Sequence, residues 1–201
     1  KKERDALRSA GKLAGIGIAA CLEPSGGNAM FEALLNPKIT TTTFMDSCRI
    51  TVDGLGSITA TMHTTSSGQG HETLVGTVIG EVLQLDPELI RVTRPDSLNS
   101  LPSGTPVGSR MAIMLGGAAF HAATKLKAKL TAIGAHDLGI APERAVYERG
   151  EVYDRNAPEK RRAWTDLVQI AYRNFHRMPA DMEPGLSVSH IMQVPTGGKL
   201  P

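Results

Sequence analysis

Two polar loops that contain glycine, each followed directly by an apolar helix pattern, constrain this chain more than any other feature. The first loop covers residues 66–73, Ser-Ser-Gly-Gln-Gly-His-Glu-Thr, and the second covers residues 104–110, Gly-Thr-Pro-Val-Gly-Ser-Arg. Free N–H groups and the helix dipole at a helix N-terminus favour anions such as phosphate. The two loops therefore predict half of a cradle for an anionic ligand. A competing interpretation is two ordinary helix caps, because Gly, Ser and Thr are common at helix starts.

The residues around the first loop predict a β-α-β unit. Cys48–Val52 and Ser57–His63 both alternate in polarity on either side of a turn at residues 53–56, which indicates a hairpin. After the loop, an apolar stripe from Leu74 to Leu83 predicts a helix, and Leu89–Val92 predicts a strand. The order strand, helix, strand is that of a β-α-β unit.

The second loop leads into a long helix pattern from about Arg110 to Ala135, with Ser109 as its expected N-cap. Ile113 belongs to the apolar stripe that is expected to face inward, and Lys127 is expected on the solvated side. Gly116-Gly117 would cost about 1 kcal/mol each relative to Ala. That cost suggests close packing or close approach of a ligand.

The first part of the chain contains an exposed helix pattern over residues 1–10 and an apolar run, Leu13–Cys21, that predicts a buried strand. Within this run, Gly15–Ala20 has the letters G-x-G-x-x-A of a dinucleotide fingerprint. That fingerprint must open a helix, but proline and glycine follow at positions 24, 26 and 27. A nucleotide-binding enzyme that uses this run would need a helix directly after Ala20.

The C-terminal part predicts less regular structure. Lys160-Arg161-Arg162 is interpreted as a solvated loop, and Thr165 as the cap of a helix. A hairpin, that helix and a final strand are expected at residues 145–153, 166–174 and 186–190.

Composition and charge exclude several classes of protein. A net charge of +2 and 4% aromatic residues give no nucleic-acid footprint, and no apolar run approaches the ~20 residues that span a bilayer. Cys21 and Cys48 form no Cys-x-x-Cys pair, which removes the usual zinc and iron–sulfur patterns. Both cysteines are expected to be reduced and structural, in a cytoplasmic compartment. The charged N-terminus leads into no signal-peptide core.

A single domain is expected over residues 1–201, as part of a larger polypeptide. Residues 1–12 are interpreted as an N-terminal extension, and residues 178–201 as a Pro/Gly-rich C-terminal segment that ends as if the fold continued in another chain.

Few residues in the first loop suit acid–base or metal chemistry. His71-Glu72 begins like a zinc-protease motif, but Val75 stands where the second histidine belongs. His71 is therefore expected to hydrogen-bond near the helix start. Gln69 carries a neutral amide with donors and an acceptor, which suits recognition of a heterocycle or an oxo group.

The combined motifs resemble one known family. Gly68-Gln69-Gly70-His71-Glu72-Thr73, an apolar helix, Pro95-Asp96-Ser97, the second loop and a helix of small residues follow one another in this order. This arrangement is similar to the large, molybdopterin-binding subunit of the molybdenum hydroxylases, the family of xanthine dehydrogenase, aldehyde oxidase and aerobic carbon monoxide dehydrogenase. The resemblance runs from about Leu13 to Pro201 and covers a middle slice of that subunit.

The resemblance implies an α+β fold: a mixed β-sheet with helices packed on it, as a fragment of the molybdopterin-binding domain. It implies that the cofactor contacts the two loops, through Gly68, Gln69, Gly70, His71, Gly108, Ser109 and Arg110. Arg110 is equally suited to a structural pair with a carboxylate. The family usually has Gly-Asp-Thr where this chain has Pro95-Asp96-Ser97, so the resemblance implies no role for Ser97.

The implied activity is oxidation of a carbon centre in a small-molecule substrate, with water as the oxygen source. The implied cofactors are molybdopterin cytosine dinucleotide with molybdenum, and FAD and 2Fe-2S clusters on partner chains or domains. The family's catalytic glutamate has no match here, so no catalytic residue and no direct metal ligand is expected in this chain. Activity would require the remainder of the molybdenum subunit, an iron–sulfur subunit and an FAD subunit. The alternative is a non-catalytic assembly module of such a complex that has lost the cofactor.

Overall fold

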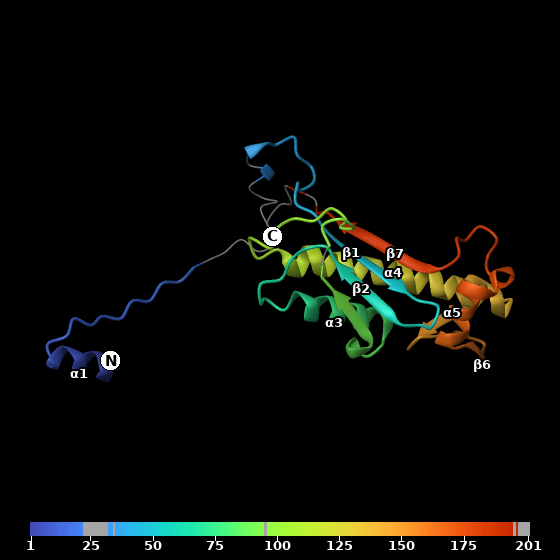
Figure 1. The fold of residues 1–201 in the computed structure, drawn as a ribbon, viewed down its shortest axis with the longest axis horizontal. Coiled ribbons are helices and arrows are strands. Elements are labelled where there is room, and N and C mark those ends of the chain that lie inside the picture. The colour runs from blue at the N-terminus through green and yellow to red at the C-terminus, as the bar shows by residue number, and fades with distance from the viewer. Residues whose placement is uncertain (22–31, 34, 95, 195, 197–201) are drawn as a thin grey trace.

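A four-stranded mixed sheet carries the long helices of this protein, in a computed structural model that describes residues 1–21, 32–33, 35–94, 96–194 and 196. Its strands lie in the order β3 (Ile90–Thr93), β2 (Ile58–Met62), β1 (Asp46–Val52) and β7 (Leu186–Met192). β1 pairs antiparallel with both β2 and β7, and β2 pairs parallel with β3. Helices α3 (His71–Leu83) and α4 (Met111–Leu138) cover one face (Figure 1). The expected α+β fold, hairpin and β-α-β unit are confirmed.

The core lies between this sheet and the two helices. Alternate residues of the hairpin are buried on the helix side, and α4 meets them with small side chains such as Ala118 and Ala122. These small residues let α4 approach the sheet closely. Cys48 is fully buried in this core, as expected, and burial raises the pKa of its thiol to about 12.

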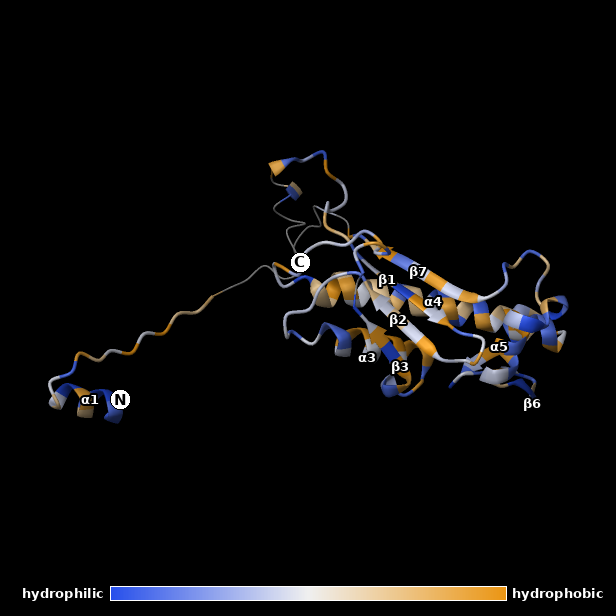
Figure 2. Cartoon of the chain, in the orientation of Figure 1, coloured by the Kyte–Doolittle hydropathy of each residue, from blue (hydrophilic) through white to orange (hydrophobic). Residues whose placement is uncertain are grey.

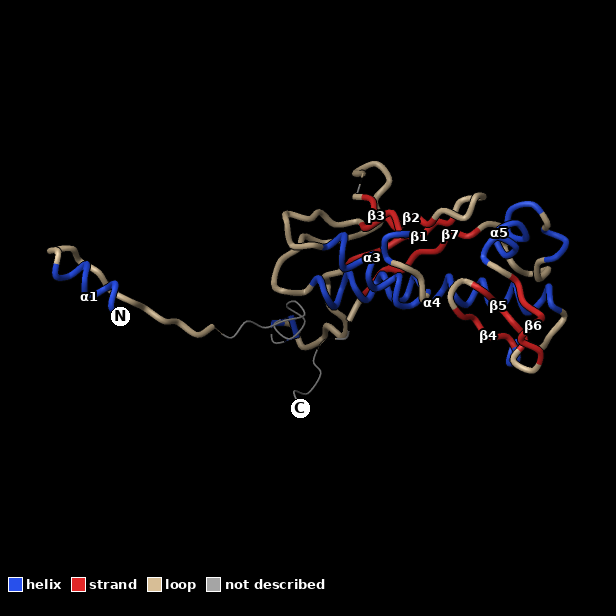
Figure 3. Tube along the Cα trace, turned by 90° about the horizontal axis from the view of Figure 1, so that it is seen from below, coloured by secondary structure: helices blue, strands red, loops and turns tan. Residues whose placement is uncertain are grey.

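A second, three-stranded sheet lies beside the C-terminal half of α4 (Figure 3). It contains β4 (Ala145–Glu148), β5 (Glu151–Asp154) and β6 (Ala157–Arg162), and helix α5 (Trp164–Arg173) follows. Short 3-10 turns occupy Pro87–Leu89, Pro142–Arg144 and Phe175–Arg177.

Two expectations for this second sheet are wrong. Lys160-Arg161-Arg162 lies in β6 and not in a loop, because Arg161 and Arg162 pair with Tyr153 and Val152 of β5, and ion pairs with Glu151 and Asp137 add to this. Thr165 does not cap α5. The helix begins one residue earlier, where the Asp166 carboxylate accepts the Ala163 N–H at 3.1 Å.

The expected position of Lys127 on the solvated side of α4 is also wrong. Its ammonium lies 3.4 Å from the Val82 carbonyl and 5.2 Å from the centre of the Tyr147 ring, and the side chain is half-buried. A long lysine stem can lie along a neighbouring element while its charge stays near water, which a helical pattern alone does not reveal.

Near the N-terminus, α1 (Lys2–Ser9) is exposed as predicted, but the buried strand over Leu13–Cys21 is wrong. Leu13 and Ile18 are 105% and 95% exposed, and Cys21 is exposed as well. The run belongs to no strand, because the strands of the described part of the chain pair with one another and not with it. Figure 2 shows this apolar segment extended and away from both sheets. The positions after Ala20 that would test the dinucleotide fingerprint lie outside the described residues.

The strand expected in the C-terminal segment is confirmed as β7, and its partner is β1 of the same chain. Beyond β7, the Thr42 N–H donates to the Val194 carbonyl at 2.9 Å, and the Thr196 N–H donates to Thr40 at 3.0 Å. The end at residues 197–201 lies outside the described residues. In the described part of the chain, none of the helices is long and apolar enough to cross a membrane.

Candidate functional site

The loop before α3 leaves a helix N-terminus open. Gly70, with φ 75°, is the N-cap of α3, and no side chain caps the first turn. Gly68 has φ 96°, and nothing lies within 4 Å of where a Cβ would stand on either glycine. Glycine adopts these left-handed conformations without a steric cost. The first N–H groups of α3 are therefore accessible to a ligand.

Gln69 and His71 differ in how much of their hydrogen-bonding capacity is free. The Gln69 Oε1 accepts the Ser67 N–H at 2.6 Å, so the carbonyl shapes the loop and the amide NH2 remains available. His71 is 5% exposed, and its Nδ1 lies 3.3 Å from the Thr65 carbonyl. It hydrogen-bonds near the helix start, as expected. Among the described residues, no group of His, Cys, Asp and Glu is arranged to hold a metal ion.

The loop before α4 also leads into a helix without a side-chain cap, but its backbone conformation differs. Gly108 and Ser109 have φ 68° and 48°, and the N-cap of α4 is Arg110, without a side-chain cap. Ser109 was expected to be the N-cap, and this is wrong because the helix begins at Met111, one residue later than that cap would allow. Ile113, expected to face inward, is 44% exposed.

The two N-termini meet at one pocket of about 490 Å³. From the sequence-predicted set, the structure brings together Gln69, His71, Gly108, Ser109 and Arg110 around this pocket. Gly68 and Gly70 flank it without lining it. The other lining residues are mainly apolar: Leu74, Pro106, Val107, Met111 and Ala112. A pocket with two uncapped helix N-termini and an apolar wall suits a ligand with a phosphate and a ring.

Arg110 contributes its backbone to this pocket more than its charge. Its side chain is 1% exposed, and its guanidinium donates to the Asp46 carboxylate and the Thr105 carbonyl. Asp46 also accepts the Ser103 hydroxyl at 2.6 Å. Burial raises the pKa of the Asp46 carboxyl, against the opposing effects of Ser103 and Arg110. Sequence reasoning missed Asp46 and Ser103; the only signal was an acidic residue at the start of an apolar strand.

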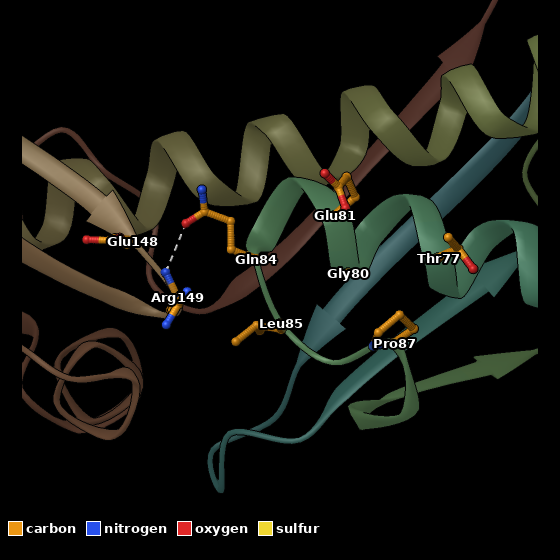
Figure 4. A pocket seen from close by; sticks show the side chains of 8 residues that line it. All are labelled: Thr77, Gly80, Glu81, Gln84, Leu85, Pro87, Glu148 and Arg149. Atoms are coloured by element: carbon orange, nitrogen blue, oxygen red, sulfur yellow. Dashed lines mark hydrogen bonds between the residues drawn. The ribbon is translucent and has the colours of Figure 1, made fainter.

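A second pocket, of about 420 Å³, lies at the opposite end of α3 (Figure 4). Glu81 of α3, the C-cap residue Gln84, Glu148 at the end of β4 and Arg149 of the β4–β5 turn line it, and the Arg149 N–H donates to Gln84 Oε1 at 3.1 Å. A helix C-terminus and two carboxylates repel an anion. The pocket at the N-termini of α3 and α4 is therefore the better site for an anionic ligand.

His63, just before the first loop, makes the fold sensitive to acid. It is 5% exposed, and its Nδ1 accepts the Leu101 N–H at 3.1 Å. Burial, and then the charge of Arg49, lower its pKa from the ordinary 6.5. Below that pH the unfolded chain binds more protons than the folded chain, so stability is lost as the pH falls. Urea unfolding at pH 7 and pH 5 should give a smaller pH-dependent loss for His63→Gln than for the wild type. Equal losses would contradict this assignment.

The fold and pocket define an α+β protein with a site suited to an anion. Comparison with known proteins gives the family: the chain belongs to the molybdopterin cofactor-binding domain family, whose profile matches residues 1–198.

The chain is also similar to the large subunits of several enzymes. The chain is 32% identical to the nicotine 6-hydroxylase large subunit of Paenarthrobacter nicotinovorans over 92% of its own length and 22% of that protein. It is 32% identical to the carbon monoxide dehydrogenase large chain of Hydrogenophaga pseudoflava, over 75% of this chain and 18% of that one. The chain thus spans about a fifth of these curated relatives.

A solved structure agrees with the fold. Quinoline 2-oxidoreductase from Pseudomonas putida 86 superposes with a TM-score of 0.73 at 25% identity, over 94% of this chain and 24% of that one.

Proposed function

We propose that this chain is a single domain, residues 1–201, of a larger molybdopterin-binding subunit and supplies part of the site for molybdopterin cytosine dinucleotide. The observation that carries the proposal is the meeting of two uncapped helix N-termini at one pocket, in a member of the molybdopterin cofactor-binding domain family. The open space above Gly68 and Gly70 fits a bulky ligand that approaches the backbone closely.

Each group of residues would make a different interaction with the ligand. The first N–H groups of α3 and α4 would hold the diphosphate, because helix dipoles and free donors both favour an anion. The Gln69 amide would hydrogen-bond a polar edge of the ligand, and Leu74 and Met111 would exclude water from one side. Gly108 and Ser109 would bring the α4 backbone into reach, and His71 would hold the first loop in shape through Thr65.

The whole protein, on this proposal, is a hydroxylase or dehydrogenase that oxidises a carbon centre in a small-molecule substrate. When bound, the molybdenum cofactor supplies the redox chemistry, with water as the oxygen source. The catalytic residues would lie outside this chain, on the remainder of the molybdenum subunit. FAD and 2Fe-2S clusters on partner chains would carry the electrons away, and the complex would work in the cytoplasm.

Analysis of the purified protein tests the proposal directly. The complete polypeptide that carries this chain, produced in a host that makes the cofactor, is expected to contain molybdenum and pterin in equal amounts. Hydrolysis of the diphosphate should release CMP, which distinguishes the cytosine dinucleotide from a mononucleotide cofactor. If the protein folds and assembles but holds neither molybdenum nor pterin, the proposal is rejected. The alternative, a non-catalytic assembly module that has lost the cofactor, would then remain.

A further inference from the structure

The buried side chain of Arg110 lies beside the proposed cofactor pocket but is occupied by the protein itself. Both ends of its guanidinium fork are taken, one by the Asp46 carboxylate and the other by the Thr105 carbonyl. The Phe44 ring covers the guanidinium carbon at 5.2 Å from the ring centre. An arginine that binds a phosphate usually presents two donor nitrogens to the ligand. Here only the buried Nε has no partner among the described residues, so no pair of nitrogens remains for an anion.

The Asp46 carboxylate is likewise bound by the protein itself. It is fully buried as the first residue of β1, and it accepts hydrogen bonds from Arg110 and from the Ser103 hydroxyl. A buried carboxylate is costly unless it is paired and hydrogen-bonded. Asp46 therefore ties two positions of the same loop, Ser103 and Arg110, to the fixed end of a central strand.

The loop between these positions has further attachments. The Gly104 N–H donates to the Met45 carbonyl at 2.8 Å, and the Gly104 carbonyl accepts the Thr64 hydroxyl at 2.9 Å. A Cβ added to Gly104 would lie 2.7 Å from an Arg110 guanidinium nitrogen. Only glycine lets the loop pass this close to the guanidinium, so loop and side chain fix each other.

We propose that Asp46 and Arg110 form a buried positioning pair, which fixes the backbone of residues 104–109 in the conformation that the anionic ligand meets. Arg110 acts through the loop and does not itself bind the anion. The inference rests on the proposed function for the identity of the ligand, but the fixing of the loop is measurable without any ligand.

Hydrogen exchange of the backbone amides of residues 104–110, measured by mass spectrometry on ligand-free protein, tests the fixing. Asp46→Asn is expected to speed this exchange by about tenfold, because it leaves the guanidinium without its counter-charge. The matched control is Asp154→Asn, which removes the charge of another buried aspartate, in β5, from its ion pair with the partly exposed Arg144. The control should leave exchange in the loop unchanged. Equal acceleration in both variants, or none in Asp46→Asn, would overturn the proposal.

If Asp46→Asn does not fold, a milder variant tests whether the pair fixes the loop. Ser103→Ala removes one hydrogen bond from Asp46 and keeps the ion pair. It is expected to speed exchange of the same amides by about threefold, and unchanged exchange would count against the positioning pair.

A double variant separates positioning from direct binding. Arg110→Gln alone leaves Asp46 buried and unpaired, so it should reduce the molybdenum retained by the protein. The double variant Asp46→Asn/Arg110→Gln removes both charges, so its loop exchange should be closer to the wild type than that of Arg110→Gln, and retention should follow the exchange. If Arg110→Gln loses molybdenum while exchange of residues 104–110 stays as in the wild type, Arg110 binds the ligand itself and the proposal fails. A wild type without molybdenum would reject the proposed function instead, and hydrogen exchange would still decide the positioning pair.

Discussion

Gly108→Val is expected to weaken binding of the molybdopterin cofactor by about 10- to 100-fold, the effect of losing one or two charge-assisted hydrogen bonds. Gly108 has φ 68°, a conformation that a β-branched residue strongly resists. It also lines the pocket beside Ser109, where a branched side chain would stand between the ligand and the first N–H groups of α4. The measurement is molybdenum and pterin per chain, followed through successive dilutions and gel filtrations.

The matched control is Gly139→Val at the other end of the same helix. Gly139 has φ 64° and follows the last residue of α4, and nothing lies within 4 Å of its missing Cβ. The backbone strain is thus of the same kind, but the pocket is far away. Gly139→Val should lower the stability of the fold and leave cofactor affinity unchanged. Equal loss of molybdenum in the two variants would show that Gly108 acts only through stability.

The parts of the fold that the sequence predicted depend on short-range patterns. Alternation in Cys48–Val52 and the stripe in α3 each report one buried face, and a buried face is what holds a strand or helix on a core. The Asp86-Pro87 step marks the end of the stripe because proline cannot continue a helix. These signals lie within a few residues of one another, so they can be recognised without knowledge of the tertiary fold.

The errors come from partners that lie far away in the sequence. Arg161 and Arg162 lie in a strand because they pair with Tyr153 and Val152 of β5, and no pattern within their own run names those partners. Leu13–Cys21 has the apolar residues of a strand, but it pairs with none of the strands in the described part of the chain.

The candidate site likewise combines features that the local sequence predicts with features that it does not. Its two loops were recognisable as helix starts, because glycine and polar residues before an apolar stripe are local signals. The pairing of Arg110 with a carboxylate was foreseen as an alternative and is confirmed, but its partner could not be named, because Asp46 lies 64 residues away. The left-handed backbone of Ser109 was also hidden, since Ser is a common N-cap and the sequence alone favours that simpler role.

Gly134→Ala is expected to destabilise the fold by about 2 kcal/mol, although alanine favours a helix over glycine. Gly134 lies inside α4, where the helix packs on the second sheet. A Cβ there would stand 2.5 Å from Val152 Cγ1 and 2.6 Å from Val152 Cβ. The Val152 Cβ is attached directly to the β5 backbone, so the clash is relieved only if the strand moves. Urea unfolding monitored by circular dichroism gives the change in the free energy of unfolding.

Gly116→Ala, in the same helix, is the control with the opposite expected sign. A Cβ on Gly116 would lie 3.7 Å from Leu74 Cδ1, an ordinary van der Waals contact. The substitution should therefore stabilise the protein by up to about 1 kcal/mol, the difference in helix propensity. Adding Val152→Ala to Gly134→Ala should relieve only the contact with Cγ1, because alanine keeps the Cβ that stands 2.6 Å away, so most of the loss in stability should remain. If Gly116→Ala and Gly134→Ala change stability alike, helix propensity governs both positions, and the contact of α4 with β5 is looser than these distances imply.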